Sequence, residues 1–146
     1  MKIFIPVLLA AILSPLAQAK ACKLSLSGTD QMQYSTKELK VAKDCDEISV
    51  TLKHAGKLAK NIMGHNFVLV KTADVSGVSG EALKVGAEKD YIPKDARILA
   101  HTKLLAGGQS DTVKFKKTIL TAGGDYTYFC TFPGHVGLMQ GKFIVE

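Results

Sequence analysis

The sequence predicts an all-β protein, an antiparallel β-sandwich of about eight short strands with one short helix in a surface excursion. Three observations support this fold class. Apolar and polar residues alternate over many short segments, glycine-containing turns separate those segments, and one longer stretch departs from the alternation. The predicted strands are centred on residues 24–26, 39–41, 48–52, 66–71, 98–100, 113–115, 126–130 and 143–145.

The predicted strands differ in how they are expected to be buried. Ile48, Val50 and Leu52 alternate with polar residues, which predicts a strand with one buried face. Residues 66–71 (NFVLVK) form a nearly continuous apolar run, which is typical of a strand buried on both faces. Turns are predicted where glycine clusters with small or polar residues, at 27–28, 54–56, 106–108 and 122–125.

Residues 73–90 interrupt the alternation. This stretch mixes glycine with the helix-favouring run EALKV at 81–85, and it therefore predicts a short helix on the surface. No repeat, linker or low-complexity tract divides the rest of the chain, so we expect a single domain over residues 20–146.

The start of the chain has the features of an export signal. A short basic start containing Lys2 precedes an apolar run at 3–13, and Ala17-Gln18-Ala19 provides a small-x-small cleavage site. We expect residues 1–19 to be a secretory signal peptide, with the mature protein beginning at Lys20. That lysine, close before Cys22, disfavours a lipid anchor, and no other segment has transmembrane length.

The charge of the chain is moderately basic. The sequence contains 19 basic and 13 acidic residues, for a net charge of +6. The lysines are spread along the chain and Arg97 is the sole arginine, a pattern typical of solvated strand faces. A nucleic-acid partner is therefore not expected.

Two of the three cysteines are expected to form a disulfide, and the third is expected to be a free thiol. Export implies an oxidising compartment, and Cys22 and Cys45 flank one short segment, so we expect them to form a disulfide. A bond closing such a loop stabilises a protein by about 3 kcal/mol in the chain-entropy description. Cys130 is left as a free thiol, which must be buried or committed to a ligand.

Cys130, His135 and Met139 lie together in the stretch YFCTFPGHVGLMQGK, residues 128–142. Thiolate, imidazole and thioether donors together select copper, and two histidines, one cysteine and a weak axial methionine make an electron-transfer site. Of the four histidines, His65 is the best second imidazole, because it directly precedes the apolar strand and follows Gly64, whose carbonyl can face a metal.

Other interpretations of these residues remain open at this point. Cys130 and Met139 taken singly are typical of core packing, while His54 and His101 are interpreted as a histidine near a turn and a surface histidine. A Cys–His hydrolase would leave Met139 unexplained. A copper storage or delivery protein would use clustered methionines, and the four methionines here are scattered.

Several motifs together resemble the azurin family of blue-copper proteins, a branch of the cupredoxins. They are MGHN at 63–66, HTKL at 101–104, CTFPGH-x-x-x-M at 130–139, DQM at 30–32 and EKDY at 88–91. The resemblance covers essentially the whole chain after residue 19. One departure is Phe67, which stands where a buried tryptophan is common in the family.

The resemblance implies an eight-stranded Greek-key, cupredoxin-like sandwich with a helical flap and one copper ion. It implies copper ligation by His65, Cys130 and His135, with Met139 as weak axial ligand and the Gly64 carbonyl as a very weak further contact. It also implies that the backbone amides of Asn66 and Phe132 point at the Cys130 sulfur.

The function that the resemblance implies is a periplasmic one-electron carrier, not an enzyme, whose copper cycles between Cu(I) and Cu(II). Its expected partners are c-type cytochromes and a periplasmic reductase or peroxidase. The protein is expected to be a monomer without stable membrane association. An exposed apolar docking patch is expected around His135, formed by Met32, Leu58, Ile62, Met63, Phe132, Pro133 and Leu138, with Gly134 and Gly137 beside them.

Overall fold

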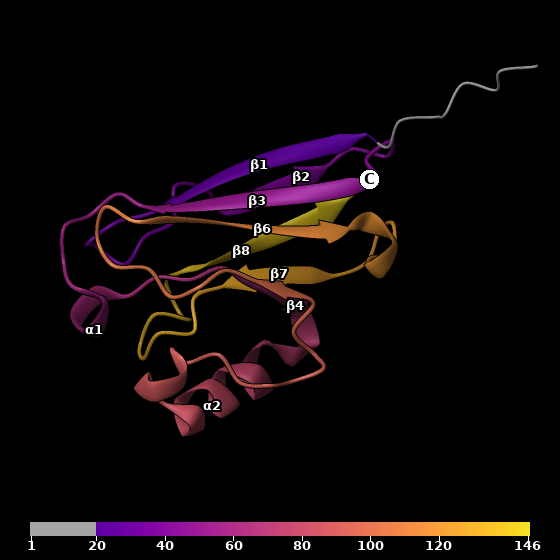
Figure 1. The fold of residues 1–146 in the computed structure, drawn as a ribbon. Coiled ribbons are helices and arrows are strands. Elements are labelled where there is room, and N and C mark those ends of the chain that lie inside the picture. The colour runs from indigo at the N-terminus through magenta and orange to yellow at the C-terminus, as the bar shows by residue number, and fades with distance from the viewer. Residues whose placement is uncertain (1–19) are drawn as a thin grey trace, which may run out of the picture.

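The computed structural model describes residues 20–146, which fold into two packed β-sheets (Figure 1). The signal peptide predicted for residues 1–19 lies outside the described residues. The strands are β1 (Ala21–Gly28), β2 (Glu38–Val41), β3 (Glu47–His54), β4 (Val68–Lys71), β5 (Ala100–His101), β6 (Ser110–Lys116), β7 (Tyr126–Phe129) and β8 (Gln140–Val145). One sheet has the order β1-β3-β6 and the other the order β2-β8-β7-β4-β5.

The predicted all-β sandwich is confirmed, and the strand directions add a detail that the sequence pattern did not contain. The pairs β1–β3 and β2–β8 are parallel, whereas the other strand pairs are antiparallel. The chain leaves the first sheet after β1, forms β2 in the second sheet and returns as β3 beside β1. Such crossings place non-consecutive strands side by side, and an alternation of polar and apolar residues does not reveal their direction.

The main core lies between the two sheets. Val50 and Leu52 from β3 meet Leu69 and Tyr128 from the opposite sheet, and all four are fully buried. Phe67 is also fully buried, and its ring stacks on Tyr128 with centroids 5.7 Å apart. Phenylalanine therefore fills this core position together with an aromatic neighbour.

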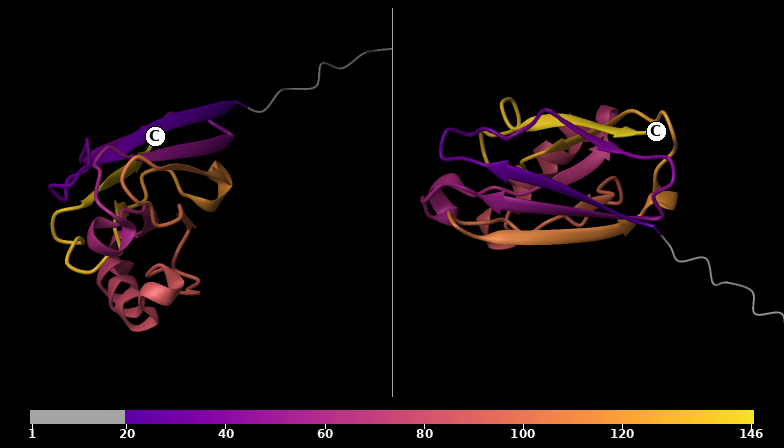
Figure 2. Two further views of the ribbon diagram at one scale, coloured as in Figure 1. Left: turned by 60° about the vertical axis from the view of Figure 1, so that its left-hand side comes forward. Right: turned by 90° about the horizontal axis from the view of Figure 1, so that it is seen from above.

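Strand β4 is buried on both faces, as its apolar run predicts. Leu69 faces the main core, whereas Val68 and Val70 belong to a second cluster on the outer side of the five-stranded sheet. Helix α2 (Val75–Val85) covers that outer side and contributes Val78 to the second cluster. Figures 1 and 2 show α2 on the side of this sheet that faces away from β1, β3 and β6.

Helix α2 begins earlier than the sequence predicts. The predicted helix at 81–85 is its last turn, and α2 extends back through Gly77 and Gly80 to Val75. Burial of Val78 and Ala82, one turn apart on one face, outweighs the low helix propensity of glycine. A second short helix, α1 (Lys60–Met63), was not predicted. Within residues 20–146 no helix combines the length and apolar character needed to cross a bilayer.

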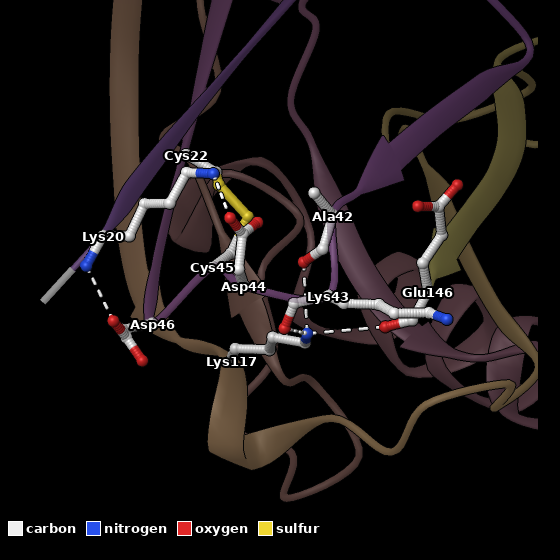
Figure 3. Close-up of a disulfide and its surroundings, with 9 residues drawn as sticks. All are labelled: Lys20, Cys22, Ala42, Lys43, Asp44, Cys45, Asp46, Lys117 and Glu146. Atoms are coloured by element: carbon white, nitrogen blue, oxygen red, sulfur yellow. Dashed lines mark hydrogen bonds and ion pairs between the residues drawn. A yellow bond between two sulfur atoms is a disulfide. The ribbon is translucent and has the colours of Figure 1, made fainter.

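The predicted disulfide between Cys22 and Cys45 is confirmed at one end of the sandwich, with 5.7 Å between the two Cα atoms (Figure 3). Beside it, the Lys117 ammonium donates to the carbonyl oxygen of Ala42 at 3.1 Å and, more weakly, to that of Glu146 at 3.4 Å. The disulfide and this lysine hold Cys22 and Glu146 at one end of the sandwich. Helix α1 and the loop after β7 lie at the opposite end (Figure 1).

Candidate metal centre

Two separate segments meet at the end of the sandwich that carries α1. His65 lies between α1 and β4, and its backbone exchanges hydrogen bonds with Leu105 at 3.1 and 2.8 Å. Cys130 directly follows β7, and its amide donates to the carbonyl of Met139 at 3.0 Å, which closes the loop between them. Inside that loop the Met139 amide donates to the His135 carbonyl at 2.8 Å. The loop therefore places Cys130, His135 and Met139 close to His65.

The structure brings the predicted donor atoms of His65, Cys130 and His135 within 4.8 Å of one another. The Cys130 sulfur lies 3.6 Å from Nδ1 of His135 and 3.7 Å from the carbonyl oxygen of Gly64. All three side chains are buried, with at most 2% of any residue exposed. A compact, dry group of one thiol and two imidazoles has the donor set of a soft-metal site.

Met139 is buried in the same region. A side chain at Gly28 would clash there, because a Cβ atom would stand 2.7 Å from Cδ2 of His65 and 3.2 Å from the Met139 methyl group. Glycine at position 28 thus lets the first strand approach the ring and the thioether together. Every residue predicted to contact the metal, Gly64 included, is buried at this end of the fold.

The hydrogen bonding of the His65 imidazole is the strongest structural indication of a metal ligand. Its Nε2 donates to the carbonyl oxygen of Thr29 at 2.7 Å, which leaves Nδ1 as the atom with a free lone pair. That Nδ1 is buried and has no hydrogen-bond partner in the described part of the chain. A buried acceptor without a donor is costly, and a bound cation removes the cost. Metal-binding histidines characteristically donate their second ring nitrogen to an oxygen in this way.

Burial sets the protonation of the donors. It lowers the pKa of His135 to about 4, with further contributions from His65 and His54, and it lowers the pKa of His65 as well. Both imidazoles are therefore neutral at neutral pH, as metal ligands must be. Burial raises the pKa of the Cys130 thiol to about 11, so that thiol releases its proton only in exchange for a metal ion.

The surroundings of the sulfur match the expectation for its amide partners. Backbone N–H groups of Asn66 and Phe132 approach the Cys130 sulfur and lower the pKa of its thiol, which partly offsets the effect of burial. The Asn66 side chain is fixed by Thr131, whose amide donates to Oδ1 at 2.9 Å and whose hydroxyl accepts from Nδ2 at 2.7 Å. These bonds join the segment of His65 to the segment of Cys130.

The two remaining histidines differ from each other. His101 is exposed on β5, as predicted. His54 is fully buried at the end of β3, and its ring stacks on His65 with centroids 4.2 Å apart. The interpretation of His54 as a histidine near a turn missed this contact. The alternation of Ile48, Val50 and Leu52, extended by two residues, places His54 on the buried face and could have revealed it.

A β-sandwich with a buried cluster of two histidines and one cysteine defines a protein built to hold one soft metal ion. Comparison with known proteins specifies the class. The family model for copper-binding proteins of the plastocyanin/azurin family matches residues 20–146. The azurin of Bordetella pertussis is 49% identical over 135 residues, covering 92% of this chain and 89% of the relative. The azurin of Pseudomonas aeruginosa is 45% identical over 140 residues, covering 95% and 94%.

Solved structures agree with the sequence comparisons. An azurin of Methylomonas sp. strain J superimposes with a TM-score of 0.82 at 40% identity, covering 86% of this chain and 98% of that one. The chain therefore belongs to the plastocyanin/azurin family of copper-binding proteins. The predictions of a cupredoxin-like fold and a copper cofactor are confirmed, and the family supports a blue-copper electron carrier rather than a hydrolase with a Cys–His pair.

Proposed function

We propose that this protein is a periplasmic one-electron carrier whose copper is held by His65, Cys130 and His135. Met139 is the weak axial ligand, and the Gly64 carbonyl is a weaker contact on the opposite side. The observation that carries this proposal is the buried Nδ1 of His65, which lacks a hydrogen-bond partner within residues 20–146 and belongs to the cluster of donors.

The arrangement suits electron transfer better than catalysis or copper delivery. Bound copper would supply the one-electron couple, and the protein would supply a complete, buried set of donors. Catalytic metal sites keep a coordination position open for substrate, whereas here Cys130, His135, Met139 and His65 all come from the protein and all are buried. A delivery site needs exposed donors that a partner can reach.

The docking patch proposed for redox partners surrounds the loop of His135. Ile62, Leu138 and Leu58 are 59%, 53% and 38% exposed, although large apolar side chains are usually covered. Met32, Met63, Phe132 and Pro133 are half-buried and complete the docking patch. The Phe132 ring lies 4.6 Å from the His135 ring, so the docking patch directly covers a proposed copper ligand. A small apolar surface suits brief encounters of a monomer with c-type cytochromes and a periplasmic reductase or peroxidase.

The copper site is tested by adding Cu(II) to residues 20–146 and recording the visible spectrum. We expect an intense blue band that disappears with reductant and returns with oxidant, because a thiolate bound to copper gives such a transition. Cys130→Ser removes the thiolate and should abolish the band while leaving the fold intact. An intense band that survives in the serine variant, or no band with a Cys130 that reacts freely with thiol reagents, would refute the ligand set.

The docking patch is tested by electron-exchange rates with a c-type cytochrome. Met63→Lys and Ile62→Lys place a charge in the docking patch and should slow exchange by roughly tenfold without changing the blue band. Leu83→Lys is the matched control, since Leu83 is 54% exposed on α2 and lies outside the docking patch. Equal rates for all three variants would exclude the docking patch as the contact surface.

The cellular location is tested separately. We propose that residues 1–19 are removed on export and that the domain at 20–146 functions in the periplasm. The Cys22–Cys45 disulfide supports this location, because disulfides persist in oxidising compartments. Amino-terminal sequencing of the protein from a periplasmic fraction should begin at Lys20, and recovery of the uncleaved chain from the cytoplasm would contradict the proposal.

A further inference from the structure

Tyr34 is a buried tyrosine that is linked to the metal centre through one intervening residue, Asn66. Its ring lies in the main core, 6% exposed, with its centroid 5.6 Å from that of Tyr128. Its phenol O–H donates to the backbone carbonyl oxygen of Asn66. Asn66 follows the proposed ligand His65, and its own N–H approaches the Cys130 sulfur and favours the thiolate. One residue thus separates the phenol from the thiolate ligand.

The hydrogen bonds of Asn66 show what the phenol adds. Thr131 holds both polar atoms of the Asn66 side chain, at 2.9 and 2.7 Å. The following amide, that of Phe67, donates to the Thr102 hydroxyl at 3.0 Å. The Tyr34 hydroxyl donates to the Asn66 carbonyl, which belongs to the same peptide as the Phe67 amide. Both the C=O and the N–H of the Asn66–Phe67 peptide are therefore hydrogen-bonded. Fixing the peptide that follows Asn66 limits rotation of the residue and helps to keep its N–H directed at the sulfur.

The phenol is suited to a permanent donor role. Burial raises the pKa of Tyr34 well above its usual value, with smaller contributions from Cys130 and Tyr128. The O–H group therefore remains protonated at neutral and mildly alkaline pH. A buried carbonyl that lost this donor would stay unsatisfied close to the metal centre.

We propose that Tyr34 is a positioning residue for the copper site, which holds Asn66 so that its N–H donates to the Cys130 sulfur and thereby raises the reduction potential. The inference rests on the proposed ligand set. The sulfur carries more negative charge when copper is reduced, so an N–H bond to it stabilises the reduced form more than the oxidised form. A loosened bond should lower the potential.

The chain offers a matched control for this role. Tyr128 is a second buried tyrosine whose O–H also donates to a backbone carbonyl, that of Thr36 at 2.8 Å. Thr36 is remote in sequence from every proposed ligand, so Tyr128→Phe removes a comparable bond from the same core while keeping the ring that stacks on Phe67. Tyr34→Phe and Tyr128→Phe are therefore compared as copper-loaded proteins by reduction potential and Tm, and as apoproteins by the hydrogen-exchange rate of the Asn66 amide.

We expect both variants to lose Tm, but only Tyr34→Phe to lower the reduction potential and to speed exchange of the Asn66 amide. Equal potentials and equal exchange rates in the two variants would overturn the inference. If Tyr34→Phe does not fold, Tyr34→3-fluorotyrosine replaces it. That side chain is a stronger donor of the same shape and should raise the potential, and an unchanged potential would again overturn the inference. Failure of the wild-type protein to give a blue band would instead refute the proposed copper site.

Discussion

The imidazole rings of His54 and His65 stack face to face, 4.2 Å apart at an interplanar angle of 21°. The His54 ring is itself held on both sides. The Gly56 amide donates to its Nδ1 at 3.1 Å, and its Nε2 lies 2.7 Å from the carbonyl oxygen of Met63. Since Nδ1 accepts, Nε2 must carry the proton and donate. The His54 ring is thus held in place by two hydrogen bonds, and by stacking it fixes the orientation of the imidazole of the proposed ligand His65.

Replacing His54 by leucine should destabilise the protein. The change leaves the Gly56 amide and the Met63 carbonyl without their partner, and each loss of that kind costs about 1–3 kcal/mol where the group is buried. We expect the free energy of unfolding to fall by about 2–4 kcal/mol in total, measured by urea denaturation of the apoprotein. His101→Leu is the control, because His101 is exposed, and it should change the free energy by less than about 0.5 kcal/mol. Equal effects of both changes would contradict the structural role of His54.

The apoprotein should lose stability as the pH falls from 6.5 to about 4. Burial lowers the pKa of His135 from 6.5 to about 4, so in this window the unfolded chain binds a proton that the folded chain does not. The contribution of His135 is complete above pH 6.5 and is lost progressively below it. The lowered pKa of His65 acts in the same direction.

Urea denaturation of the apoprotein at a series of pH values measures this loss. One such group contributes a slope of up to about 1.4 kcal/mol per pH unit, and we expect about 3 kcal/mol in total from His135 between pH 6.5 and 4. His135→Gln should flatten the profile between these pH values by that amount. A profile of the same steepness in both proteins would show that other groups cause it.

Cys130 in the folded apoprotein should react slowly with thiol reagents. Burial raises the pKa of its thiol from 9.0 to about 11, which lowers the thiolate fraction at pH 8 roughly hundredfold. Alkylation by iodoacetamide should therefore be at least about hundredfold slower in the folded protein than in the same protein in denaturant. Mass spectrometry over time gives both rates. Rapid alkylation of the folded apoprotein would mean that the thiol is exposed or activated.

Gly64→Ala should disturb the metal centre through the backbone. An added Cβ atom would stand 2.5 Å from the Lys60 carbonyl oxygen and 2.9 Å from the Leu104 side chain, so the backbone must shift. The Gly64 carbonyl oxygen, 3.7 Å from the Cys130 sulfur, shifts with it. We expect the free energy of unfolding to fall by about 1–3 kcal/mol and the blue band to change position.

Gly80→Ala is the matched control for that change. A Cβ atom at Gly80 would have no neighbour within 4 Å among residues 20–146, and the residue lies inside α2, where alanine is the better helix former. Gly80→Ala should therefore raise the free energy of unfolding by about 0.5–1 kcal/mol and leave the spectrum unchanged. A blue band that moves in both variants, or in neither, would contradict the role assigned to Gly64.

The sequence predicts the sandwich and the donor cluster for different physical reasons. Strand patterns such as Ile48, Val50 and Leu52 are visible because each strand has one face in the core, and burial has a period of two residues. The donors of Cys130, His135 and Met139 are visible because one short loop carries all three. His65 is distant in sequence, and Gly64 together with the family motif identified it.

Features that arise from packing between segments distant in sequence could not be predicted from local sequence patterns. The parallel pairing of β1 with β3 depends on how the chain crosses between sheets. The start of α2 depends on the burial of Val78 against β4, which outweighs the local effect of Gly77 and Gly80. The bond from Tyr34 to Asn66 joins residues from two segments that meet only in the folded protein.

The position of Lys20 and Glu146 beside the Cys22–Cys45 disulfide has a practical consequence. Lys20 and Glu146 emerge at the end of the sandwich opposite α1 and the loop of His135 (Figures 1 and 3). A linker attached at Glu146 can therefore anchor the molecule to an electrode or a fusion partner with the copper end directed away from the support. Tethering of this kind would orient a whole layer of molecules alike, without engineering any residue of the docking patch.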